Sequence, residues 1–342
     1  MPMNNQKMIV VTGATGFIGS NLLFALESKG YTNIVGIDNF GNGEKWKNVA
    51  KRSFVFFVLP EQMKDFLDSH TKDISAIIHL GGISTTTETN VDEIVKTNIQ
   101  LSVYLYEYCK KNYIQFIYAS SAATYGLIKD DFEKFEDAQD IGFLKGLKPL
   151  NAYGWSKHCI DKYISIDRSR KNSENQTVGL KFFNVYGPNE YHKGEQISVA
   201  AKFYYQYVKY GKAKLFKYND HGRYKALSLP DLSPRRDFVY VDDCVNVIIW
   251  MIEHDDISGL FNVGTGIATT FEMIAKIVAK SVGKDPDMEY IEMPEALRPQ
   301  YQDYTCADLK KLRDVGYKVE MTRVEDGVEE YVKRYLSRNM YK

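Results

Sequence analysis

The chain has 342 residues, 44% of them hydrophobic, which is enough to bury one large core or two ordinary ones. Lys and Arg number 44, as do Asp and Glu, so no global field would recruit nucleic acid or an anionic membrane. No apolar run approaches the roughly 20 residues that span a bilayer, and the opening MPMNNQK does not have the build of a signal peptide. We therefore expect a soluble, cytoplasmic protein without nucleic-acid or membrane partners.

The cysteines predict neither a metal centre nor a disulfide framework. Cys109, Cys159, Cys244 and Cys306 lie far apart, and no two of them form a C-x-x-C pair. We interpret them as reduced thiols and expect no metal.

The first predicted element is a buried strand that ends in glycines. The stretch MIVVTGATGFIG, residues 8–19, places Gly13, Gly16 and Gly19 three apart, and an amphipathic stretch follows at once. A strand, a glycine turn and a helix in succession let the backbone approach a pyrophosphate, which the N-terminal N–H groups of the helix can bind. The pattern predicts a dinucleotide site, with a tight packing turn as the structural alternative.

The next predicted strand, residues 33–38, ends in an acidic residue. Asp38 lies 19 residues after Gly19, where a carboxylate accepts hydrogen bonds from the adenine ribose and favours NAD. Lys45 and Lys47 follow in the same loop, and a cation there could neutralise the 2′-phosphate of NADP. Both dinucleotides remain open, as does a solvated role for the two lysines.

Further apolar runs alternate with helical patterns along the chain. Strands are expected over 53–60, 75–80, 114–121 and 176–184, with a helical pattern from Asn90 to Lys111. Later segments predict strands over 238–241 and 259–264 and a helix over 269–283. The alternation predicts an α/β fold with a doubly wound parallel sheet and a smaller, interleaved C-terminal substrate domain. We expect the dinucleotide-binding domain over 1–184 plus 236–268, and the substrate domain over 185–235 plus 269–342.

Two stretches in the middle of the chain indicate acid–base chemistry. Ser121 ends the strand over 114–121, and NAYGWSK, residues 151–157, places Tyr153 and Lys157 one helical turn apart. An ammonium beside a phenol lowers the phenol pKa toward the range of a general base, and Ser121 could bond the same substrate hydroxyl.

The Tyr-x-x-x-Lys spacing is unspecific by itself. It also occurs at Tyr106/Lys110, Tyr205/Lys209 and Tyr210/Lys214. The order of motifs distinguishes Tyr153, because a glycine turn and a Ser-Ser strand precede it and the ends of parallel strands meet at one edge. We therefore predict Tyr153 and Lys157 as catalytic.

Together, TGATGFIG, SSAATYG, YGWSK and FFNVYGPNE resemble the extended short-chain dehydrogenase/reductase superfamily, whose members share the Rossmann fold and mostly modify nucleotide sugars. More narrowly, GGISTTTE, KFFNVYGPNEYHKG, RRDFVYVDD, FNVGTG and YQDYTCADL resemble the ADP-L-glycero-D-manno-heptose 6-epimerase family. This likeness covers nearly the whole chain.

The resemblance implies a cofactor and a set of site residues. The implied cofactor is NADP, with NAD as the alternative, at Phe17, Ile18, Asp38, Asn39, Lys45, Leu80, Gly81, Gly82, Ile83, Ser84, Asn98, Lys157 and Val185. The implied contacts to a nucleotide-diphosphate sugar are Ser84, Asn184, Phe216, Arg236 and Tyr301. Proton transfer falls to Tyr153 and Lys193, whereas we interpret His192 as a polar loop residue without a role. We also expect a homo-oligomer.

The predicted reaction is transient oxidation of a sugar carbon followed by return of the hydride to its other face, which inverts the stereocentre. A dehydratase is disfavoured because Ala122 and Ala123 stand where it needs acidic residues. A 4-epimerase on another nucleotide sugar and a net oxidoreductase remain alternatives. Three features depart from the family: a long polar loop between Phe216 and Arg236, and Glu195 and Lys202 at implied substrate contacts.

Overall fold

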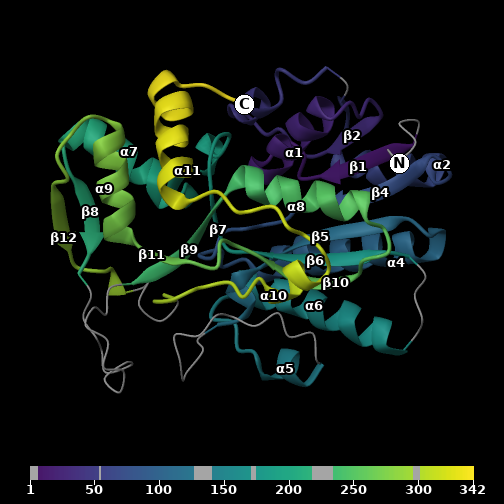
Figure 1. Ribbon diagram of the computed structural model, residues 1–342. Helices are drawn as coiled ribbons and strands as arrows, with labels where there is room; N and C mark the ends of the chain where they lie inside the picture. The colour runs from purple at the N-terminus through teal and green to yellow at the C-terminus, as the bar shows by residue number, and fades with distance from the viewer. Residues whose placement is uncertain (1–6, 54, 127–140, 171–174, 218–233, 296–300) are drawn as a thin grey trace.

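Seven parallel strands form the central layer of the molecule (Figure 1). The computed structural model describes residues 7–342 except 54, 127–140, 171–174, 218–233 and 296–300. Across the sheet the strands run in the order β3 (Val55–Val58), β2 (Ile34–Ile37), β1 (Met8–Thr12), β4 (Ile74–His79), β5 (Gln115–Ser121), β6 (Thr177–Phe182) and β10 (Gly259–Val263). Val10 in β1 pairs with Val35 on one side and Ile77 on the other, and all three are buried. Apolar runs therefore form strands that are covered on both faces.

Helices cover both faces of this sheet. One face packs against α1 (Phe17–Ser28), α8 (Val241–Glu253) and α10 (Lys310–Asp314). The other face packs against α2 (Met63–His70), α4 (Leu101–Asn112) and α6 (Ala152–Arg170). Two short helices, α3 (Val91–Ile94) and α5 (Ile141–Gly146), precede α4 and α6, and the residues between α3 and α4 form a π-helical segment over 95–100. The arrangement confirms the predicted doubly wound sheet.

A smaller part of the chain extends from one end of the sheet (Figure 1). It has one mixed sheet of β11 (Ala268–Thr270), β9 (Arg235–Tyr240) and β7 (Asn184–Tyr186), and a parallel pair of β12 (Met288–Ile291) and β8 (Ala213–Phe216). The helices α7 (Val199–Tyr210), α9 (Phe271–Ser281) and α11 (Val324–Glu330) share its apolar core. The two parts interleave in the sequence, since β9 belongs to this part while β10 joins the large sheet. The domain boundaries drawn from the sequence stay a prediction.

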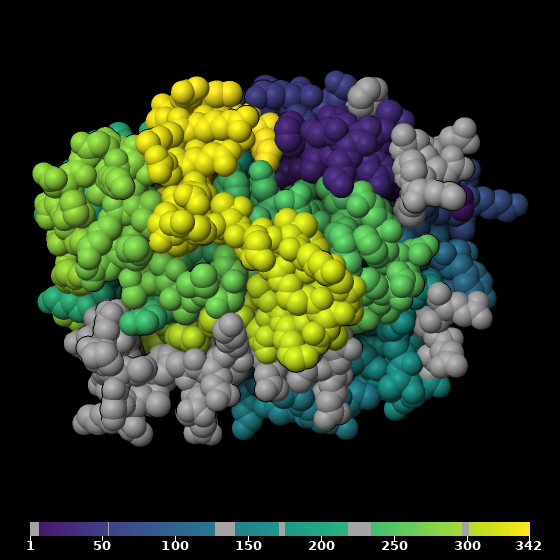
Figure 2. Space-filling model, viewed as in Figure 1, coloured from purple at the N-terminus to yellow at the C-terminus, as the bar shows by residue number. Residues whose placement is uncertain are grey.

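The last described residues lie against both parts of the molecule (Figure 2). The backbone N–H of Lys342 donates to Asn189 Oδ1 at 2.9 Å, and its ammonium pairs with Asp242 at the start of α8. The ring of Tyr341 packs edge-on against Tyr191, with 5.0 Å between the ring centroids. These contacts hold the turn that begins at Tyr191, which forms part of the site described below.

Candidate functional site

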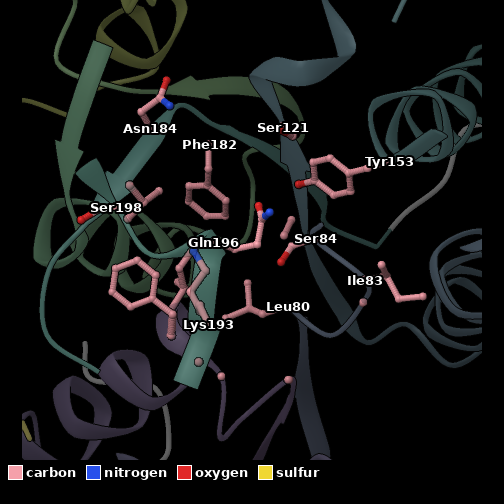
Figure 3. A pocket seen from close by; sticks show the side chains of 18 of the residues that line it. Leu80, Ile83, Ser84, Ser121, Tyr153, Phe182, Asn184, Lys193, Gln196 and Ser198 are labelled. Atoms are coloured by element: carbon pink, nitrogen blue, oxygen red, sulfur yellow. The ribbon is translucent and has the colours of Figure 1, made fainter. Parts of the chain in front are cut away.

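An open cavity of about 610 Å³ lies at the carboxyl ends of β1, β2, β4, β5 and β6 (Figure 3). The predicted site residues in its wall are Gly13, Gly16, Phe17, Ile18, Gly19, Asp38, Lys45, Leu80, Gly81, Gly82, Ile83, Ser84, Ser121, Tyr153, Lys157, Asn184, Val185 and Lys193. The predicted residues outside this wall are Asn39, Asn98, Phe216, Arg236 and Tyr301. Ligands of open α/β sheets bind at this edge.

The glycine turn after β1 forms a cradle that side chains would fill. A Cβ on Gly19 would lie 2.1 Å from the carbonyl oxygen of Gly13, and one on Gly13 would lie 2.6 Å from the backbone nitrogen of Gly81. Gly13 also has a φ of 67°, in the left-handed region. Gly16 caps α1 without a side-chain hydrogen bond, and no acidic residue stands in the first turn. The free N–H groups and positive dipole end of α1 therefore face the cavity, which fits the pyrophosphate of a dinucleotide.

A buried network holds the loop after β4 against this cradle. Thr12 Oγ1 lies 2.7 Å from His79 Nδ1 and accepts a hydrogen bond of 3.2 Å from the N–H of Gly81. Burial, and next the charge of Lys157, lower the pKa of His79 to about 3, so its ring is neutral. Asn98 holds Ile83 at both its N–H and its carbonyl, at 2.8 and 2.9 Å. Asn98 thus positions the cavity wall from behind.

Asp38, which follows β2, is held from two directions. Its Oδ2 accepts hydrogen bonds from the N–H and hydroxyl of Thr15, at 2.9 and 2.7 Å. Its Oδ1 pairs with Lys45 Nζ at 2.8 Å, and the same ammonium donates to the carbonyl of Asn39. Lys47, the other candidate cation, pairs with Glu44 and is absent from the cavity wall. Of these two lysines, Lys45 is therefore the one that lines the cavity.

Tyr153 and Lys157 enter the cavity from the first turns of α6. Asn151 Oδ1 accepts the N–H of Gly154 at 2.8 Å and so caps this helix. A Cβ on Gly154 would lie 2.6 Å from the carbonyl oxygen of Ala123, so a glycine allows α6 to pack closely against the end of β5. Figure 3 shows the hydroxyl of Tyr153 pointing into the cavity near Ser121. The helix thus brings the predicted tyrosine, lysine and serine together.

The pKa of Tyr153 moves in the direction opposite to our prediction. Burial raises it, and a hydrogen bond with Ser121 only partly opposes the rise. Burial also lowers the pKa of Lys157 to about 8, against the attraction of Asp161. The net pKa shift of Tyr153 is thus opposite to the one that we predicted, because burial is the largest cause of the shift in both groups.

Asp161, one helical turn beyond Lys157, belongs to a buried network that we did not predict. Its carboxylate accepts hydrogen bonds from Tyr118 at 3.1 Å and from Ser120 at 2.7 Å, and it pairs with Lys181 at 2.5 Å. Both members of this ion pair are at most 2% exposed. The network fixes the end of β5, where Ser120 and Ser121 line the cavity.

Lys193 lies in a short 3₁₀ turn, residues 191–196, and reaches the cavity from the side opposite Tyr153 (Figure 3). Its ammonium lies 5.2 Å from the centroid of the Phe17 ring. Burial lowers the pKa of Lys193, the charge of Glu190 opposes this shift, and the charge of Lys202 adds a smaller lowering. The buried carboxylate of Glu190 accepts the N–H and the hydroxyl of Ser198, both at 2.6 Å, and so anchors this segment.

The remaining predicted substrate residues form an aromatic and cationic cluster beside the cavity. The guanidinium carbon of buried Arg236 lies 5.1 Å from the ring centroid of Tyr301 and 5.7 Å from that of Phe271. Phe216 meets Tyr301 edge-on, with 6.5 Å between the ring centroids. Phe271 also lines the cavity, so it connects the cluster to the site. Most of the loop between Phe216 and Arg236 lies outside the described residues.

Sequence reasoning missed part of the cavity wall. These lining residues are Ala119, Ser120, Phe182, Phe183, Gln196, Ile197, Ser198, Val199, Phe238 and Phe271, together with His192, to which we had given no role. Ala119 and Ser120 directly precede Ser121 in β5, Phe182 and Phe183 directly precede Asn184, and the residues over 192–199 surround Lys193, so proximity to predicted residues was the available signal for these. Phe238 and Phe271 had no such signal.

Comparison with known proteins gives one consistent family. Residues 9–264 match the NAD dependent epimerase/dehydratase family. An ADP-L-glycero-D-manno-heptose-6-epimerase of Nitratidesulfovibrio vulgaris is 42% identical over 332 residues, 96% of this chain and 98% of that protein. One of Fusobacterium nucleatum is 37% identical over 97% of this chain and 98% of that protein.

A solved structure extends the likeness to three dimensions. The crystal structure of the Helicobacter pylori ADP-L-glycero-D-manno-heptose-6-epimerase matches with a TM-score of 0.79 at 26% identity, and 98% of each chain is covered. In the part of this chain that the structure describes, no helix is long and apolar enough to cross a membrane. The chain belongs to the NAD-dependent epimerase/dehydratase family.

Proposed function

We propose that this protein is an ADP-L-glycero-D-manno-heptose 6-epimerase that works with bound NADP. One observation carries the proposal: a tyrosine and a lysine enter one cavity from opposite sides, next to a backbone cradle built for a dinucleotide. Inversion by oxidation and reduction needs a proton acceptor on one side of the sugar carbon and a proton donor on the other. The relatives from Nitratidesulfovibrio vulgaris and Fusobacterium nucleatum support the choice of sugar.

Tyr153 takes the hydroxyl proton in the oxidation half of the reaction. Its pKa is raised by burial, so it needs positive charge beside it to act as a base near neutral pH. Lys157 provides one such charge from the next turn of α6, and Ser121 orients the hydroxyl through a hydrogen bond. When bound, the oxidised nicotinamide supplies a further positive charge and accepts the hydride from the same carbon.

Lys193 completes the reduction half. The keto sugar has to present its other face before the hydride returns, which moves its oxygen away from Tyr153. Lys193 then donates a proton to that oxygen, and its lowered pKa makes the proton easier to release. The sugar ends with one inverted centre and the dinucleotide in its starting oxidation state. Tyr153 then releases the proton that it took to solvent, and Lys193 takes one back from solvent.

Arg236 is the residue that we assign to the diphosphate of the substrate. A guanidinium binds phosphate oxygens with two parallel hydrogen bonds, and stacking against Phe271 and Tyr301 fixes its plane. Ser84 and Asn184, which line the cavity, would contact the sugar. Glu195 and Lys202 differ from the expected substrate contacts, so the nucleotide base and sugar need a direct test.

NADP is the cofactor that the loop after β2 favours. Lys45 lies in the cavity wall beside Asp38 and can balance a 2′-phosphate, while Asp38 could still receive the ribose hydroxyl of NAD. We therefore propose NADP as the preferred cofactor and NAD as the alternative.

The test is turnover on a panel of ADP-, GDP-, UDP- and dTDP-sugars, followed by NMR of the sugar protons. We expect inversion at one carbon of ADP-glycero-manno-heptose, without net formation of reduced dinucleotide. Inversion at C4 of another nucleotide sugar would replace the assignment with a 4-epimerase. Stoichiometric consumption of free dinucleotide would show a net oxidoreductase, and absence of turnover on every sugar would overturn the epimerase proposal.

A further inference from the structure

His192 occupies the end of the cavity where Asp38 and Lys45 lie, although it neighbours Lys193 in the sequence. The ring lines the same cavity as these residues and is close enough to both for their charges to act on it. Asn48, in the 3₁₀ turn over 45–48 that also carries Lys45, lies 3.1 Å from His192 Nδ1 through its Nδ2. The turn over 191–196 thus reaches the two ends of the cavity with two adjacent side chains.

The contact with Asn48 determines which ring nitrogen of His192 carries the proton. Asn48 Nδ2 also donates to the carbonyl of Thr15 at 2.9 Å, which assigns the amide nitrogen to this side of the buried Asn48 side chain. His192 Nδ1 then accepts the second N–H, and its proton must sit on Nε2. Burial, and next the charges of Lys45 and Lys193, lower the His192 pKa to about 4, although Asp38 and a hydrogen bond with the backbone of Asn189 oppose them. The ring is therefore a neutral donor at Nε2.

The polar groups beside His192 already make hydrogen bonds within the protein. Lys45 spends one N–H on Asp38 and another on the carbonyl of Asn39, which leaves one of its three free. Both oxygens of Asp38 accept hydrogen bonds, from Lys45 and from Thr15. A phosphate on the ribose brings three oxygens to this corner. A single remaining N–H of Lys45 cannot satisfy three oxygens, and His192 lies in the same part of the cavity wall with a further donor.

We propose that His192 donates a hydrogen bond through Nε2 to the 2′-phosphate of the dinucleotide and so shares the selection of NADP with Lys45. The proposal rests on the proposed function, because it assumes that NADP is the cofactor. It replaces our interpretation of His192 as a loop residue without a role. It also means that the turn which carries Lys193 is itself held by the adenosine end of the cofactor.

The test uses two fragments, adenosine 2′,5′-bisphosphate and adenosine 5′-monophosphate, which differ only in the 2′-phosphate. Calorimetric titration of His192→Ala should show roughly 10-fold weaker binding of the bisphosphate and less than about twofold change for the monophosphate. His192→Gln, whose amide nitrogen can replace Nε2 as a donor, should recover most of the loss. His254→Ala is the control, because its ring bonds the carbonyl of Trp250 and lies outside the cavity wall.

The binding ratios of the two fragments decide the role of His192. Equal weakening of both fragments, or no change in either, would overturn the role of His192. A thermal melt of each variant separates a loss of binding from a loss of folding. If His192→Ala destabilises the turn, the comparison of His192→Gln with the wild-type protein still tests the proposal. If the wild-type protein binds both fragments equally, the choice of NADP fails and this proposal with it. If Lys45→Ala removes the preference while His192→Ala keeps it, NADP stands and only the role of His192 falls.

Discussion

The two ends of the cavity are built from different parts of the polypeptide. The end that we assign to the dinucleotide is made mainly of backbone: Gly13, Gly16, Gly19 and Gly81 meet where β1 and β4 end, and α1 presents its N–H groups. The end that we assign to the substrate is made of side chains, and through Phe271 it continues into the cluster beside the cavity, where Arg236 lies near Phe271 and Tyr301. A backbone site tolerates almost no added atoms, whereas a side-chain site can change its ligand by substitution. One scaffold can therefore retain its cofactor and vary its sugar.

The largest expected effect comes from adding one methyl group to the glycine cradle, which tests whether its backbone forms the pyrophosphate site. Gly19→Ala would place a Cβ 2.1 Å from the carbonyl oxygen of Gly13, so the turn has to move. We expect no measurable dinucleotide binding by calorimetry and a lower melting temperature. Gly43→Ala is the control, because no heavy atom lies within 4 Å of its added Cβ. Wild-type affinity in Gly19→Ala would show that the backbone does not form the pyrophosphate site.

The second prediction concerns Tyr153, the side chain to which we assign proton abstraction. Tyr153→Phe removes the proton acceptor but almost no packing area, so kcat should fall roughly 100- to 10,000-fold with near-normal cofactor binding. Tyr205→Phe is the control, since Tyr205 has the same spacing to a lysine but is 47% exposed on α7. Steady-state kinetics at saturating sugar nucleotide decide the question. A kcat within a few-fold of wild type would require another base.

Lys193 tests whether the substrate end supplies a second proton-transfer group. Lys193→Met should lower kcat roughly 100-fold with each epimer as substrate, and it should change KM little. A lysine that only neutralises the diphosphate would instead raise KM and leave kcat mostly intact. Lys209→Met, on the exposed face of α7, is the matched control. A large KM effect with unchanged kcat would contradict the two-base reaction.

The same difference explains what the sequence could predict. The cradle, Asp38 after β2, and the pair Tyr153 and Lys157 follow from local order, because strand ends and helix starts place them at one edge of the sheet. Spacing alone also placed Tyr153 and Lys157 on one helix. It could not give their burial, and burial decides the direction of both pKa shifts.

The substrate end depends on tertiary packing that no local pattern contains. Phe271 reaches the cavity because α9 packs against β9, where Phe271 meets Phe238 edge-on. The buried Asp161–Lys181 pair joins α6 to β6 across 20 residues of sequence. Arg236 and Tyr301 were expected from the family resemblance, but their stacking required the fold. The missed wall residues over 196–199 lie where such packing brings their segment beside the cavity.

The smallest expected effect separates the two dinucleotides at the backbone-built end. Lys45→Ala removes the cation that would face a 2′-phosphate and leaves Asp38 Oδ1 without its ion pair. The bared carboxylate repels that phosphate but can accept a ribose hydroxyl, so NADP should bind roughly 10-fold more weakly while NAD binds as well as before. Calorimetry with both dinucleotides measures the ratio. Lys47→Ala is the control, because Lys47 pairs with Glu44 outside the cavity wall and should leave both affinities unchanged. If Lys45→Ala weakened the binding of both dinucleotides equally, the Lys45 charge would stabilise the loop and would not recognise the 2′-phosphate. A preference for NADP would then have to come from other residues.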